Sequence, residues 1–104
     1  MNGRHEIDSR REQIEAICRE HGVARLLVFG SVLRDDFNPD TSDIDLLVKF
    51  MPNVQKPWAG EYTDLQSAME ALFRRRVDVI PEGSIKNPYR LVNIEREQEL
   101  LYAA

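Results

Sequence analysis

The sequence from residue 42 to residue 50 reads Ser42-Asp43-Ile44-Asp45-Leu46-Leu47-Val48-Lys49-Phe50. Apolar side chains stand at every second position of this stretch, at Ile44, Leu46, Val48 and Phe50. Because a β-strand turns successive side chains to opposite faces of a sheet, the pattern predicts a strand with one firmly buried face. Asp43 and Asp45 are then expected to lie together on the opposite face.

Two other short apolar runs predict further strands. The run Arg25–Phe29 ends at Gly30-Ser31, as expected of a central strand that stops at a tight turn. The run Val77–Ile80 is closed by Pro81 and Gly83, which are typical of turns.

Helical spacing of apolar residues separates these strands. Ser9 and Glu12 have the spacing of a capping box, so the first helix is expected from about Ser9 to His21. A second amphipathic helix covers residues 65–73, and a last helix is expected to begin at Asn87-Pro88 and to reach Leu101. The expected order is helix, strand, strand, helix, strand, helix. This predicts an α/β (α+β) fold, with a small mixed sheet of about three or four strands flanked by helices.

Length and composition narrow the class of protein. The chain has 104 residues, 42% hydrophobic and 31% charged, so residues 1–104 are expected to form a single domain. The formal net charge of −4 disfavours direct nucleic-acid binding through phosphate neutralisation. The longest apolar run has four residues, too short to enter a membrane, and no secretory signal is recognisable, so we expect a cytoplasmic location.

Three acidic residues within or beside strands need an explanation. Asp43 and Asp45 begin the second strand and Asp78 lies inside the third. Aspartate is depleted from strands, and neighbouring carboxylates on one face repel each other. If the third strand pairs beside the second, the three carboxylates can hold one hard cation, and Mg²⁺ suits a site with few carboxylates and a phosphate substrate.

The turn at Gly30-Ser31 points to the same chemistry. It follows a strand and precedes a predicted helical turn, an arrangement in which backbone N–H groups and a hydroxyl can approach a phosphate. A metal cluster beside such a turn is the minimum apparatus for phosphoryl or nucleotidyl transfer.

Each feature also has a purely structural interpretation. Gly30-Ser31 alone would be read as an ordinary turn, and Ser42-Asp43 as a strand-entrance turn, but the three acids together favour a metal site. Arg74-Arg75-Arg76 is interpreted as a solvated helix end, because cations complement the helix dipole there. Cys18, the only cysteine, is expected to be a small core residue.

The three motifs, read together, resemble a known superfamily. They are Phe29-Gly30-Ser31-Val32-Leu33-Arg34, Ser42-Asp43-Ile44-Asp45-Leu46-Leu47-Val48 and Val77-Asp78-Val79-Ile80. The chain resembles the polymerase-beta-like nucleotidyltransferases, in which G-S is followed after about ten residues by D-x-D and later by a third acid on a strand. Here 12 positions separate Ser31 from Asp43. Within the superfamily, the chain is most similar to the minimal nucleotidyltransferase (MNT) antitoxins encoded beside HEPN ribonuclease toxins.

This resemblance implies a nucleotidyltransferase fold and a role for each motif residue. Gly30 and Ser31 would hold the triphosphate of ATP, and Arg34 would contact phosphate or the partner. Asp43 and Asp45 would bind both of two Mg²⁺ ions, and Asp78 would complete the site of the ion that activates the acceptor hydroxyl.

The function implied is Mg²⁺-dependent transfer of AMP from ATP to a tyrosine hydroxyl of a partner HEPN ribonuclease toxin, in a hetero-oligomer. Two alternatives remain open at this stage. One is a non-catalytic antitoxin that neutralises the toxin by binding and occlusion. The other is a small-molecule nucleotidyltransferase whose missing parts come from another subunit.

Overall fold

The computed structural model describes residues 3–33, 38, 43–54 and 60–104. Its centre is a four-stranded sheet in the order β3-β2-β1-β4. The strands are β1 (Val23–Phe29), β2 (Ile44–Phe50), β3 (Val77–Pro81) and β4 (Gln98–Ala103). β1 pairs antiparallel with both β2 and β4, and β2 pairs parallel with β3. The expected mixed sheet, with β3 beside β2, is therefore confirmed.

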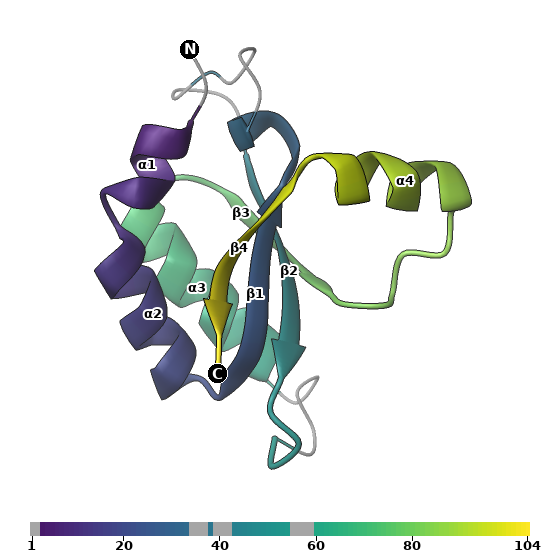
Figure 1. Ribbon diagram of the computed structural model, residues 1–104. Coiled ribbons are helices and arrows are strands. Elements are labelled where there is room, and N and C mark those ends of the chain that lie inside the picture. The colour runs from purple at the N-terminus through teal and green to yellow at the C-terminus, as the bar shows by residue number, and fades with distance from the viewer. Residues whose placement is uncertain (1–2, 34–37, 39–42, 55–59) are drawn as a thin grey trace.

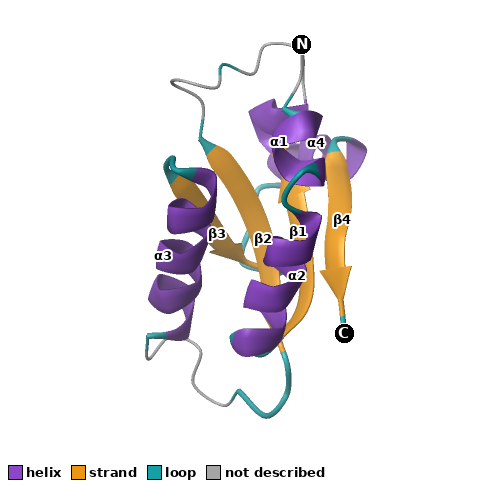
Figure 2. Cartoon of the chain, turned by 90° about the vertical axis from the view of Figure 1, so that its left-hand side faces the viewer, coloured by secondary structure: helices purple, strands orange, loops and turns teal. Residues whose placement is uncertain are grey.

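Helices cover the two faces of the sheet unequally. One face packs against α1 (Arg4–Asp8), α2 (Arg11–Glu20) and α3 (Glu61–Phe73), whereas α4 (Pro88–Arg96) lies on the other face (Figures 1 and 2). A short 3₁₀ helix, η1 (Gly30–Leu33), continues directly from the end of β1. None of the helices in the described part of the chain is long and apolar enough to cross a membrane.

The alternation of side chains along the strands produces two apolar clusters. The main core lies under α1, α2 and α3, and its strand residues include Leu26, Val28, Ile44, Leu46, Val48 and Val77. The helices contribute Ile7, Ile14, Cys18, Leu65, Met69 and Phe73. The second cluster, on the other face, joins Phe29 and Leu47 to Ile94 of α4. Cys18 is fully buried, as predicted, and burial raises the pKa of its thiol to about 12.

The predicted last helix was wrong beyond residue 96. The helix ends at Arg96, and residues 98–103 form β4 along the outer edge of β1. Ile94 and Leu101 have helical spacing, but Ile94 belongs to the second cluster and Leu101 to the main core. Because the two clusters lie on opposite faces of the sheet, no single straight helix can bury both residues.

The predicted capping box at the start of α2 was also wrong. Ser9 caps the end of α1 instead, and Arg10 stands at the N-cap of α2 without a side-chain cap hydrogen bond. α1 itself was not predicted; it buries Ile7 completely. Gly22 follows α2 with φ of +71°, as expected for a left-handed helix end.

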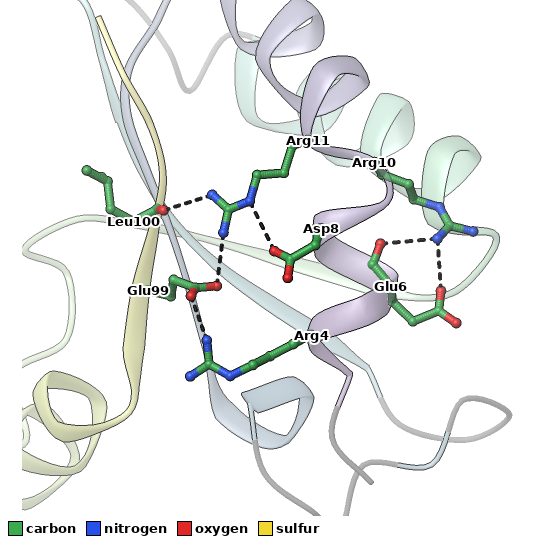
Figure 3. A network of polar contacts seen from close by, with 7 residues as sticks. All are labelled: Arg4, Glu6, Asp8, Arg10, Arg11, Glu99 and Leu100. Carbon is green, nitrogen blue, oxygen red and sulfur yellow. Dashed lines mark hydrogen bonds and ion pairs between the residues drawn. The ribbon is translucent and has the colours of Figure 1, made fainter.

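A polar network joins α1 and α2 to β4. Glu99 accepts from Arg4 at 2.6 Å and from Arg11 at 3.3 Å, and Arg11 also donates to Asp8 at 3.1 Å (Figure 3). These contacts attach the beginning of the described chain to its last strand.

The interpretation of the arginine run after α3 as a solvated helix end needs one correction. Arg74 and Arg76 are exposed, but the Arg75 side chain is only 12% exposed and lies 3.7 Å from a carboxylate oxygen of Glu6. Arg75 therefore packs between α3 and α1, because α1 brings an acidic side chain to that position.

Candidate active site

Asp45 and Asp78 lie side by side at one end of the sheet. They are register partners across the parallel pair of β2 and β3, and Phe29 of β1 is the partner of Asp45 on the other side. The three residues form one row across the sheet, on the face that carries α4. The neighbouring row, two residues away on each strand, is apolar and lies beneath α4; it consists of Leu27, Leu47 and Ile80. The acids therefore sit at the boundary of the second cluster.

The electrostatics of Asp45 show how closely the acids are packed. Burial raises the pKa of Asp45 to about 6, with further upward contributions from the charges of Asp78 and Asp43 and from a hydrogen bond with Asp78. The charge of Arg90 acts in the opposite direction. Asp45 therefore lies partly buried among like charges, and this position favours its neutral form over its charged form.

Gly30 is held against this pair. It has φ of +85°, and a Cβ built at this position would lie 2.6 Å from Oδ2 of Asp45. A larger residue would be both strained and in collision with the carboxylate. The turn after β1 thus brings a backbone segment directly onto the acidic row, which is where glycine permits close approach.

The carboxylate oxygens of these acids are suitable ligands for a divalent cation, although they are not arranged around a central ion position. In the part of the chain that the structure describes, no three acidic, histidine or cysteine side chains form a ready-made metal cage. Asp45 and Asp78 turn toward each other, with Asp43 close enough to raise the pKa of Asp45. A hard cation prefers such carboxylate oxygens and would offset the repulsion among them.

The structure places some of the motif residues and leaves others aside. Gly30, Asp43, Asp45 and Asp78 come together at one end of the sheet. The backbone of Ser31 lies in η1. Arg34, for which the family resemblance implies a phosphate or partner contact, lies outside the described residues.

Sequence reasoning missed Arg90, which lies close enough to influence Asp45. The sequence did give the local signal: Asn87 before Pro88 predicts a capped helix start, and the Asn87 side chain accepts from the backbone N–H groups of Tyr89 at 2.9 Å and Arg90 at 3.2 Å. It did not indicate which face of the sheet the helix would cover, and that placement brings Arg90 to the acids.

Comparison with known sequences finds nucleotidyltransferases. A family model described as "Nucleotidyltransferase domain" matches residues 10–101. Protein adenylyltransferase MntA from Thermococcus cleftensis is 35% identical over 86 residues, covering 73% of this chain and 81% of the relative. A candidate protein adenylyltransferase from Methanocaldococcus jannaschii is 34% identical over 98 residues, covering 86% of this chain and 94% of the relative.

Solved structures show the same fold. A candidate minimal nucleotidyltransferase aligns with a TM-score of 0.70 and 32% identity, covering 95% of both chains. A more distant match, at 16% identity and a TM-score of 0.59, comes from a complex of a tri-AMPylated Shewanella oneidensis HEPN toxin with an MNT antitoxin. That match covers 93% of this chain and 72% of the other, and shows likeness of fold.

Proposed function

This chain belongs to the nucleotidyltransferase domain family, in its minimal (MNT) branch, and we propose that it is an antitoxin that transfers AMP from ATP to a tyrosine hydroxyl of a HEPN-family ribonuclease toxin. Family membership makes it an enzyme of the nucleotidyltransferase type, as predicted. The observation that carries the proposal is the row of Asp45 and Asp78 with Gly30 packed on it. We take residues 1–104 as a single minimal nucleotidyltransferase domain.

The proposed reaction is a nucleotidyl transfer at the α-phosphorus of ATP. The tyrosine oxygen of the partner attacks the α-phosphorus, the bond to the bridging oxygen of the β-phosphate breaks, and pyrophosphate leaves. Asp78 accepts the proton of the attacking hydroxyl. The backbone N–H groups of Gly30 and Ser31 bind the triphosphate, since both residues lie in the turn that meets the acidic row.

Asp43, Asp45 and Asp78 would hold Mg²⁺. When bound, Mg²⁺ lowers the pKa of a hydroxyl and offsets the negative charge of phosphates. The raised pKa of Asp45 supports this assignment, because beyond burial it reflects the charges of Asp78 and Asp43, whose repulsion an added positive charge would offset.

A HEPN toxin is the proposed partner on three grounds. The relatives include a protein adenylyltransferase named MntA, and the fold matches an MNT antitoxin solved with an AMPylated HEPN toxin. The net charge of −4 also suits association with a basic, RNA-binding protein. We therefore propose a hetero-oligomer in which this chain binds nucleotide and makes no direct contact with nucleic acid.

The decisive experiment mixes this chain with the product of the adjacent gene, which we propose to be a HEPN toxin, and with MgATP. A small fraction of a molar equivalent is expected to silence the ribonuclease lastingly, and intact mass should rise by AMP on a tyrosine. The variant Asp43→Asn with Asp45→Asn should lose this activity. The control Glu12→Gln with Glu20→Gln makes the same charge change on exposed positions of α2 and should retain it.

Two other results would replace the proposal. Silencing that needs stoichiometric amounts, ignores ATP and survives the double aspartate variant would identify an occluding antitoxin. Release of pyrophosphate only when a small hydroxylated molecule is added, with no mass change on the toxin, would identify a small-molecule transferase.

A further inference from the structure

α4 is fixed on the same face of the sheet as the acidic row. Ile94 is only 6% exposed and packs in the second cluster with Phe29 and Leu47. Phe29 and Asp45 are register partners, so the helix is anchored directly beside the acids. In Figure 1, α4 stands apart from the three helices that cover the opposite face.

Arg90 lies one helical turn before Ile94, and residues four apart share one side of a helix. The Asn87 side chain accepts a hydrogen bond from the backbone N–H of Arg90, which stabilises the first helical turn, where Arg90 lies. Arg90 therefore lies on the side of α4 that carries Ile94, the helix residue of the second cluster.

A cavity of about 160 Å³ connects Arg90 with the turn after β1. It is lined by Phe29, Gly30, Arg90, Asn93, Ile94 and Glu97. Gly30, with its left-handed backbone against Asp45, forms one wall, and the inward side of α4 forms the other. A phosphate in this cavity would meet the backbone of the turn and the side chain of Arg90 together.

We propose that Arg90 is a nucleotide-binding residue, and that its guanidinium and the turn at Gly30 grip the triphosphate from opposite walls of this cavity. The inference rests on the proposed nucleotidyltransferase function. It adds a phosphate-binding residue from α4, a helix outside the sequence motifs.

The physical need for such a residue comes from the acids. Asp43, Asp45 and Asp78 present clustered negative charge where a polyanion must bind, and a cation held nearby offsets the repulsion that remains. Arginine suits the position because its planar fork of donors binds phosphate oxygens in pairs and stays charged at every physiological pH.

The test measures binding by calorimetry, with MgATP and with magnesium tripolyphosphate as separate ligands. Arg90→Ala is expected to weaken both by roughly tenfold or more, the range for loss of a hydrogen bond to a charged group. Arg90→Lys should recover part of the loss, since it keeps the charge but not the fork. Arg96→Ala is the matched control, an exposed arginine on the same helix outside the cavity, and should bind both ligands like the wild type.

The outcomes separate this inference from the function on which it rests. If the wild type binds both ligands and Arg90→Ala binds them equally well, the inference is overturned and the proposed function stands. Weaker binding of MgATP with unchanged binding of tripolyphosphate also overturns it, because the contact would then be to the nucleoside. A wild type that binds neither ligand overturns both. Thermal unfolding of each variant should match the wild type, since Arg90 is exposed.

Discussion

The two faces of the sheet have different roles: one carries the main apolar core, and the other carries the acidic residues of the candidate site. On β2, Ile44, Leu46 and Val48 are at most 1% exposed and pack under the helices of one face. Asp45, between the first two of them, points to the other face and stays partly accessible. A strand alternates with period two, so a rigid apolar core can hold carboxylates in place from behind. The comparison shows that the main core holds the acids in position, while repulsion among the acids opposes folding.

The largest effect on stability should come from the face of the sheet that packs against α1, α2 and α3. Leu46 is fully buried in the main core, so Leu46→Ala should lower the free energy of unfolding by about 3 kcal/mol. Urea denaturation measures this loss. A loss no greater than that of an exposed substitution such as Leu100→Ala would contradict the assignment of the main core.

The turn at Gly30 should be the most sensitive backbone position on the acidic face. Gly30→Ala adds a Cβ that collides with Asp45 Oδ2 and strains a backbone at φ of +85°. Gly83→Ala is the matched control, because Gly83 has the same φ and no atom within 4 Å of its added Cβ. Both variants should lose about 1 kcal/mol from strain. Only Gly30→Ala should also lose MgATP binding, which calorimetry measures. If Gly30→Ala and Gly83→Ala bind MgATP equally well, the close approach of Gly30 to Asp45 is not needed for nucleotide binding.

Neutralising the acids should change the stability of the protein in the opposite direction from truncating a core side chain. Asp43→Asn with Asp45→Asn relieves repulsion among neighbouring carboxylates, so the metal-free protein should gain stability. A gain of about 0.5 kcal/mol corresponds to a rise of roughly 2 to 4 °C in the melting temperature. The Glu12→Gln and Glu20→Gln pair should change it much less. A fall in melting temperature would mean that the acids support the fold.

A further effect should appear as a pH dependence of the metal-free protein. The pKa of Asp45 is about 6 in the folded state and 3.8 in a model compound, so the folded state binds the proton more tightly. Asp45 therefore favours folding below about pH 4 relative to neutral pH, and this contribution is lost as the pH rises through about 6. NMR titration of the Asp45 carboxyl should show the raised pKa, and added Mg²⁺ should lower it. An unshifted pKa would contradict the close packing with Asp78.

The sequence predicted β1, β2, β3 and the acids because these signals are local. Alternation of apolar residues identified β2, and the acids appeared as exceptions within strands. β4 and the position of Arg90 could not be found in this way. Residues 94 to 101 satisfy a helical spacing equally well, and only the free edge of β1 and the split between two clusters select a strand. The partial burial of Arg75 likewise depends on Glu6, which is distant in sequence.

The pairing of β4 with β1 also affects the order in which the strands pair during folding. Arg25 and Ala103 are register partners although 78 positions separate them, whereas Phe29 and Asp45 are only 16 positions apart. Long loops close slowly, so β1 is expected to pair with β2 well before it pairs with β4. During synthesis on the ribosome, β1 therefore keeps one edge open until residues 98–103 have emerged. An open edge of this kind is a template for pairing with another chain, and β4 covers it on β1 while becoming the outer edge of the sheet itself.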